Sequence, residues 1–235
     1  DCLSELTAVG ERSTKLGAVG PKQVDWDDPE RLVEVGIRAT RSGRRVPEID
    51  VGERDQGQYD IRSDVLGIGT AGMLVRLAAA EEVGWLDTAL GPFGDGLEFS
   101  RRLRAAGWRV AISPGASIQH ERVSFAKGKQ SYGKRRAAQL YNSLVAARAL
   151  WLPFAVLGYV LGGPIRALAR LLTKEPGLAA QELSAVGAMV GMLPKALAAR
   201  ARLRRVRKVP ASVIAGLEAS GRDVRVGRRA RRWAR

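Results

Sequence analysis

Residues 69–120 constrain the fold of this chain more than any other segment. In order, they hold an apolar stretch at 73–75, an alanine-rich stretch at 77–83, a glycine-rich acidic loop, an arginine-bearing stretch at 97–106 and an apolar stretch at 108–112. The spacing of apolar residues predicts a strand, a helix, a loop, a helix and a strand. Strands and helices that alternate on this scale predict an α/β layer structure.

The ends of the last two elements are marked by residues that stop regular structure. Gly107 follows the second predicted helix and is typical of a left-handed helix end. Pro114 is expected to close the strand that starts at 108, and a second short strand at 117–119 then leads to His120. A lone histidine at a strand end is suited either to bind a divalent cation or to make a structural hydrogen bond.

Upstream, short apolar runs at 16–19, 32–35 and 65–68 predict further buried strands. Residues 42–59 show no apolar period and are rich in Gly, Pro, Arg and Asp, so they predict a long surface loop. The sequence GIGTAG at 67–72 precedes a predicted strand, which argues against a dinucleotide-binding fingerprint. Its glycines are expected to let the backbone pass close to a substrate or a neighbouring strand.

Charge divides the chain into two parts. Residues 1–122 carry 16 Lys or Arg against 20 Asp or Glu, whereas residues 123–235 carry 23 against 4. Such asymmetry indicates a polyanionic partner for the second part, either nucleic acid or an anionic membrane surface. The single Cys excludes an internal disulfide, and the single His excludes a cluster of His ligands.

The second part also contains two uncharged runs. Residues 127–147 predict a basic helix, the run at 149–165 follows, and a shorter run covers 183–194. A membrane-spanning helix needs about 20 apolar residues, and both runs have basic flanks. Two shallow helices at the cytoplasmic face, with Arg and Lys reaching anionic headgroups, fit this pattern better than a span. The alternative is a pair of core helices in a soluble helical domain.

Asp95 and Glu98 concentrate the potential chemistry in the acidic loop. With a helix that starts near Gly96, both carboxylates lie in its first turn, where the helix dipole favours their ionised forms. A carboxylate there can accept a proton from an incoming hydroxyl. It can instead cap the helix, which is the common role of acidic residues at this position.

The same segment resembles the GT-A glycosyltransferases of the large inverting family 2. Each matching piece is short, but together they occur in the family's order and spacing over about residues 15–122. The pieces are Gly72-Met73-Leu74-Val75-Arg76, Val83-Gly84-Trp85-Leu86-Asp87, Phe93-Gly94-Asp95-Gly96-Leu97-Glu98-Phe99, Arg102 with Gly107-Trp108-Arg109-Val110, and Pro114, Ala116 and His120. The stretches GPKQVDWDDPERLVEVG and GERDQGQYD further resemble actinobacterial members with large membrane-bound parts.

The resemblance implies a nucleotide-diphospho-sugar donor, a divalent metal (Mn²⁺ or Mg²⁺) and an inverting single displacement. In one alignment, Asp95 corresponds to the Glu of the family's acidic loop, and Gly96 corresponds to the Asp that usually acts as base. In an alignment shifted by one residue, Asp95 corresponds to that Asp. The expected base is therefore Asp95, with Glu98 as the alternative. The implied substrate-binding residues are Gly72, Met73, Arg101, Arg102 and Trp108, and the implied metal ligand is His120. Most of the metal site is expected in a nucleotide-binding half that precedes this chain.

These observations predict three regions: the C-terminal part of a Rossmann-like GT-A domain at 1–122, a helical membrane-associated region at 123–208 and a basic tail at 209–235. The expected function is sugar transfer to a cell-envelope polysaccharide or glycolipid, with a glycan or lipid-linked acceptor, at the cytoplasmic face of the cell membrane. The alternatives are a non-catalytic scaffold of the same family and a basic nucleic-acid-binding protein. The second alternative lacks any nucleic-acid-binding module and is disfavoured.

Overall fold

The computed structural model describes residues 1–61, 64–121 and 132–225. A four-stranded mixed sheet is built around strand β1 (Leu16–Asp25). Strand β4 (Arg109–His120) pairs with β1 in parallel along its whole length. The short strands β2 (Leu32–Glu34) and β3 (Leu74–Val75) pair with β1 in antiparallel fashion, so they share its other edge. Residues 16–24 are all buried, as expected of a central strand that is covered on both faces.

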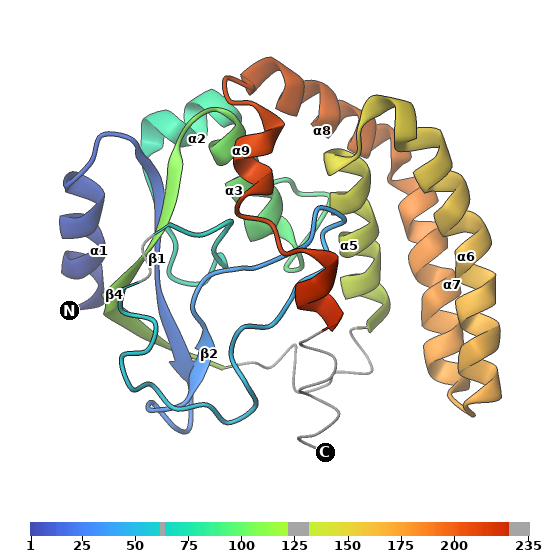
Figure 1. The fold of residues 1–235 in the computed structure, drawn as a ribbon, viewed down its shortest axis with the longest axis horizontal. Coiled ribbons are helices and arrows are strands. Elements are labelled where there is room, and N and C mark those ends of the chain that lie inside the picture. Colours follow the sequence, from blue (N-terminus) through green and yellow to red (C-terminus); the bar gives the residue numbers. More distant parts are fainter. Residues whose placement is uncertain (62–63, 122–131, 226–235) are drawn as a thin grey trace.

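Helices cover both faces of the sheet (Figure 1). Helix α1 (Cys2–Glu11) places Leu6 against Val19 and Ala111 on one face. Helices α2 (Leu77–Val83) and α3 (Asp95–Ala105) cover the other face, where Phe99 and Leu103 pack in the central cluster. The predicted α/β class is confirmed, and this arrangement is consistent with a GT-A-like domain.

The strand predicted at residues 65–68 does not form. Isolated bridges join Asp64 to Ala111 and Ile37 to Gly67, and among the described residues no ladder continues from either. The apolar residues are nevertheless buried, because the segment packs against α3 and the Ile68 N–H donates to Ser100 Oγ at 3.3 Å. The apolar run at 65–68 therefore reflects burial against a helix and not membership of a strand.

Strand β4 also differs from the prediction, because it continues through Pro114 to His120. Its pairing moves from Pro21↔Ser113 directly to Lys22↔Ser117, which leaves residues 114–116 as an irregularity in the ladder. Proline is tolerated within a strand at such a bulge, where its missing N–H removes no ladder hydrogen bond. The left-handed Gly107 (φ +94°) at the end of α3 is as predicted.

The second part of the chain is mostly helical over its described residues, 132–225. Its elements are α5 (Tyr132–Ala146), the 3₁₀ turn η1 (Ala149–Trp151), α6 (Leu152–Leu172), α7 (Pro176–Gly191), α8 (Leu193–Val206) and α9 (Ala211–Ala215). The basic helix predicted from residue 127 is confirmed from Tyr132 onward, and its first residues lie outside the described part. Helices α6 and α7 run side by side, and α8 returns toward α2 and α3 (Figure 1). Gly163 lets α6 approach α7, because a Cβ there would lie 2.5 Å from Val186.

One hydrophobic cluster joins these helices to the sheet half of the molecule. Leu97 of α3 lies in the same cluster as Leu144 of α5, Met189 of α7 and Leu203 of α8. The main-chain N–H groups of Lys208 and Val209 both donate to the Ala105 carbonyl. The region boundaries predicted at 122 and 208 stay predictions, and the buried core extends across both positions.

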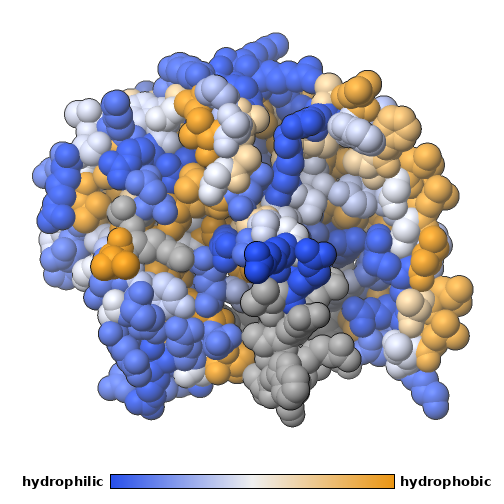
Figure 2. All heavy atoms as spheres, in the orientation of Figure 1, coloured by the Kyte–Doolittle hydropathy of each residue, from blue (hydrophilic) through white to orange (hydrophobic). Residues whose placement is uncertain are grey.

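Helix α6 differs from the other helices in what it exposes. With the preceding turn it forms a 24-residue stretch, Ala149–Leu172, of mean hydropathy 1.4, which is long and apolar enough to cross a membrane. Only 11% of its most apolar window is buried inside the structure. Figure 2 shows the resulting apolar surface along the edge of the molecule formed by α6 and α7. Helices α7 and α8 pass the same test only as a pair bent by 58°.

Candidate active site

The acidic loop leads directly into α3. The helix begins at Asp95, after Gly94 in a left-handed conformation (φ +76°), and its first turn contains both Asp95 and Glu98, as predicted. No side chain caps this helix end, so the capping alternative for the two carboxylates is wrong. The side chain of the half-buried Asp95 makes no hydrogen bond or ion pair with any other described residue. Its carboxylate is therefore available at the positive end of α3.

Gly96 leaves no room for a side chain. A Cβ at this position would lie 2.3 Å from the Ile68 carbonyl oxygen and 3.4 Å from Gly69 Cα. Because contacts below 3.0 Å essentially never occur for real Cβ atoms, an Asp at position 96 would have to displace the backbone at Ile68. The structure thus leaves Asp95 as the half-exposed carboxylate at the start of α3.

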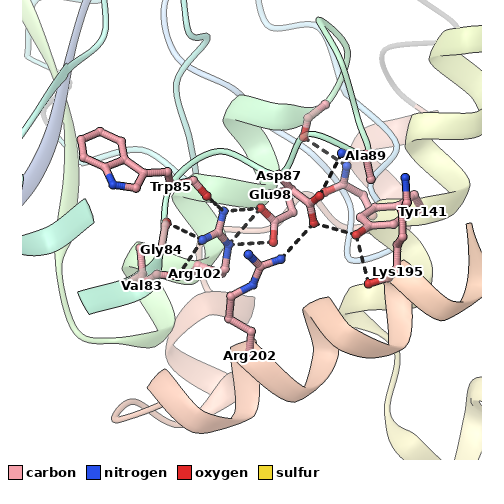
Figure 3. A network of polar contacts seen from close by, with 12 residues as sticks. Val83, Gly84, Trp85, Asp87, Ala89, Glu98, Arg102, Tyr141, Lys195 and Arg202 are labelled. Atoms are coloured by element: carbon pink, nitrogen blue, oxygen red, sulfur yellow. Dashed lines mark hydrogen bonds and ion pairs between the residues drawn. The ribbon is translucent and has the colours of Figure 1, made fainter. Parts of the chain in front are cut away.

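Glu98 occupies a different environment, within a buried polar network. Its carboxylate accepts from Arg102 Nη2 at 2.7 Å and from Arg102 Nε, and the side chains of the pair are 1% and 0% exposed. Arg102 also donates to the carbonyls of Val83, Gly84 and Trp85, which fixes the chain after α2 against α3 (Figure 3). Burial raises the pKa of Glu98, and the Arg102 guanidinium opposes that shift.

The network continues to the helices of the second part. The Asp87 carboxylate accepts from Tyr141 Oη of α5 at 2.7 Å and from Arg202 Nη2 of α8 at 3.2 Å (Figure 3). Burial, followed by the hydrogen bond to Asp87, raises the pKa of the Tyr141 phenol, which stays protonated as a donor. Glu98 and Arg102 are therefore placed to hold the elements around Asp95 together, because every polar atom they carry is directed into the protein.

Two further predicted substrate-binding residues make internal contacts. Arg101 is 7% exposed, and its Nη2 donates to the Thr40 carbonyl and to Glu218. Trp108 donates from Nε1 to Glu82 at 2.9 Å, next to the start of β4. His120 ends the same strand, so the structure does not bring Trp108 and His120 together. The side chains of Arg101 and Trp108 thus contact other parts of the protein. A substrate-binding role for either residue stays a prediction.

Gly72 and Met73 lie beside the second half of β4. Gly72 has a φ of +74°, and a Cβ there would lie 2.8 Å from both Pro21 and Ile118. Met73 is half-buried and packs against the central hydrophobic cluster. The glycines of residues 67–72 were expected to let the backbone pass close to a substrate or a neighbouring strand. This is confirmed for Gly72, whose backbone passes close to the sheet.

A cavity of about 520 Å³ lies at the carboxyl ends of the two parallel strands. Asp25 and His120, the last residues of β1 and β4, are direct ladder partners there and both line it. Ligands of open α/β sheets bind at this end of the strands. A hydrogen bond from Arg31 lowers the pKa of Asp25, and Nδ1 of His120 is buried without a hydrogen-bond partner among described residues. His120 was among the predicted site residues. Asp25 was not, because the strand was predicted only over residues 16–19 and Asp25 lies six residues beyond that run.

Glu34 connects this cavity to the start of α3. It lines the cavity, and its carboxylate accepts from the Gly69 N–H at 2.9 Å and from Arg45 Nη1 at 2.7 Å. Gly69 in turn lies against Gly96, the residue after Asp95. Gly69 thus links the cavity wall to the start of α3.

The described residues do not fit a complete metal site. Within residues 1–61, 64–121 and 132–225, no group of three or more His, Cys, Asp or Glu is placed to hold a metal ion. His120 and Asp25 supply at most part of one, so no chemical step is assigned to a metal here.

The family described as Glycosyltransferase like family 2 matches residues 1–142, which is more than half of the chain. The chain belongs to this family. The match runs from α1 through the sheet and α3 into α5, so the acidic loop and β4 lie within it. No curated protein matches the chain. Membership implies glycosyl transfer in general, from a nucleotide-sugar donor to an acceptor.

Proposed function

We propose that this glycosyltransferase is an inverting enzyme in which Asp95 is the base. The acceptor hydroxyl gives its proton to the Asp95 carboxylate while its oxygen forms a bond to the anomeric carbon of the donor sugar. The bond from that carbon to the diphosphate breaks in the same step, and the nucleoside diphosphate leaves with the electron pair. The supporting observation is that Asp95 is half-exposed and without a polar partner among the described residues.

Glu98 is the weaker choice for the base. A base must lie within hydrogen-bond reach of the hydroxyl that it deprotonates. The Glu98 side chain is 1% exposed and is held by Arg102, so a substrate hydroxyl has no open path to it. We assign Glu98 and Arg102 a positioning role, in which they fix α3 and therefore Asp95.

The cavity at the strand ends is our proposed place for the transferred sugar. Its wall combines the carboxylates of Asp25 and Glu34 with the guanidinium groups of Arg31 and Arg45. Such groups donate to and accept from sugar hydroxyls, and arginines also suit the negatively charged diphosphate. A divalent metal remains an expectation from the family resemblance.

A donor screen tests this function. Uridine-, thymidine- and guanosine-diphospho-sugars, each with Mn²⁺, are incubated with the protein and a lipid extract as acceptor, and release of the nucleoside diphosphate is measured. We expect release with at least one donor, dependent on the extract. A folded protein that releases no nucleotide from any donor contradicts the proposal and favours the non-catalytic scaffold.

We also propose that α6 rests on a membrane surface. A stripe of large apolar side chains repeats every three or four residues along the outward side of the helix. The stripe consists of Phe154, Leu157, Leu161, Ile165, Leu168 and Leu172. Contiguous exposed apolar surface of this kind is typical of an interaction site, and the high content of Lys and Arg in this part favours an anionic lipid surface. Because the cytoplasmic leaflet carries the negative surface potential, we propose the cytoplasmic face as the location.

Vesicle flotation tests the membrane contact. The protein is expected to float with vesicles that contain phosphatidylglycerol, also in the presence of excess competing DNA. Leu157→Glu with Leu161→Glu should reduce the floating fraction at least about fivefold, because two charges then enter the apolar face. The matched control is Leu3→Glu with Leu77→Glu, two exposed leucines on α1 and α2. Equal flotation of both double variants would contradict a contact through α6.

A further inference from the structure

A second cavity, of about 920 Å³, lies between α5, α6, α7 and the loop around Arg44. Among the described residues, its lining contains a single acidic residue, Glu182, and six arginines. The arginines are Arg44, Arg45, Arg135, Arg136, Arg166 and Arg170. Because these positions come from three different segments, only the tertiary structure gathers them around one space.

Buried Glu182 organises two of these arginines. It is 2% exposed, accepts a hydrogen bond from Tyr132, and lies 3.3 Å from Arg166 Nε and 3.6 Å from Arg136 Nε. Arg166 Nη2 and Arg136 Nε are both buried and have no hydrogen-bond partner among the described residues. Buried donors that lack a partner are costly, so each such group calls for a ligand or another explanation.

The position of the cavity links it to both proposals above. Gly94, the residue before Asp95, forms part of its wall and is held there by the Asn142 amide, which donates to the Gly94 carbonyl at 3.1 Å. Arg166 and Arg170 reach the cavity from α6, whose outward side carries the apolar stripe. A ligand with an anionic head in the cavity would thus lie near Asp95 at one end and near the proposed membrane surface at the other.

We propose that this cavity binds the phosphate or diphosphate group of a lipid-linked acceptor. Guanidinium groups match phosphate oxygens with paired, charge-assisted hydrogen bonds, and several converge here. The adjoining apolar stripe suits the lipid chain. The identification of the ligand as the acceptor rests on the proposed function. The inference that this cavity binds a phosphate or diphosphate group does not.

Ala169 offers a direct test, because it lines the cavity from α6 and is itself exposed, so a longer side chain there is compatible with folding. Binding of farnesyl diphosphate and of inorganic pyrophosphate to the protein is measured by isothermal titration calorimetry without any sugar donor. Ala169→Glu should weaken farnesyl diphosphate binding at least about tenfold by placing a negative charge among the arginines, which corresponds to roughly 1.4 kcal/mol. Ala169→Gln, of the same size but neutral, should bind nearly as well as the unmodified protein.

A second variant checks the arginines themselves. Arg166→Gln is expected to weaken binding about tenfold or more, whereas Arg205→Gln, at an exposed position of α8, should leave it unchanged. Thermal unfolding of each variant identifies any loss that comes from misfolding. Absence of binding by the unmodified protein, or equal binding by Ala169→Glu and Ala169→Gln, would overturn the inference. Equal affinity for pyrophosphate and farnesyl diphosphate would overturn the lipid-linked part. Failure of the proposed function would instead appear as lack of nucleotide release in the donor screen.

Discussion

Replacing Asp95 with Asn is expected to lower the rate of sugar transfer about 10²–10⁴-fold, the range typical for loss of a general base. The amide of Asn cannot take the proton of the acceptor hydroxyl, although it has nearly the same shape. Because the Asp95 side chain makes no polar contact with another described residue, the substitution removes only its interaction with the positive end of α3, worth about 0.3–1 kcal/mol. The unfolding temperature should therefore fall by no more than about 4 °C. The measurement is nucleotide release with a donor that is active in the screen, together with thermal unfolding by circular dichroism.

The matched control is Glu81→Gln, which neutralises an exposed carboxylate on α2 and should retain full activity. If Asp95→Asn transfers sugar at close to the normal rate, the base lies elsewhere and the assignment is wrong. If Glu98→Gln alone lost activity without any loss of stability, Glu98 would replace Asp95 as the proposed base.

Replacing Arg102 with Met should have the largest effect on stability. It leaves the Glu98 carboxylate buried without its partner and removes the donors to the carbonyls of Val83, Gly84 and Trp85. Breaking a buried pair by removing one partner costs about 3–5 kcal/mol. For a protein of this size that corresponds to a decrease in unfolding temperature on the order of 10 °C. Arg205→Met, at an exposed position, should leave the unfolding temperature within about 2 °C of the original, because surface substitutions change stability little.

The pH dependence of this variant distinguishes the lost ion pair from lost packing. Burial already raises the pKa of Glu98, and without Arg102 only the weaker effect of the Arg202 charge opposes that shift. An acid whose pKa is raised in the folded state is favoured there in its protonated form. Its stability penalty is therefore absent below the unfolded pKa of about 4.3, grows as the pH rises from that value to the folded pKa, and is complete above it. The stability difference between Arg102→Met and the original protein should therefore be larger at pH 7 than at pH 4. A difference independent of pH would mean that packing, not charge, is what the substitution disrupts.

Local patterns were enough to predict the elements around the candidate site. The helix of α3, the left-handed Gly107 at its end and the presence of two carboxylates in its first turn all follow from spacing within a dozen residues. The Glu98–Arg102 pair also had a local signal, because residues four apart lie on the same side of a helix. What that spacing does not reveal is burial, which turned a potential base into a structural ion pair.

Features that depend on distant segments were not predicted. The apolar residues 65–68 are buried by α3 and not by strand partners, and β4 continues past Pro114 because a bulge accommodates the proline. The cavity with Asp25 arises only when β1 and β4 pair in parallel over nearly a hundred intervening residues. No sequence window contains both strands, so this juxtaposition has no local signal.

By itself, the amino-acid sequence determined the α/β class, the family resemblance and the contrast between an acidic and a basic part, because these depend on residue order and composition. The tertiary structure decided which carboxylate is available, which arginines surround a common cavity and which helix exposes its apolar side. These properties depend on burial and proximity, which arise only when residues far apart in the chain pack together. Asp95 and Glu98 show the difference most directly: three positions apart in one helix, one is left half-exposed by the fold and the other is buried against Arg102.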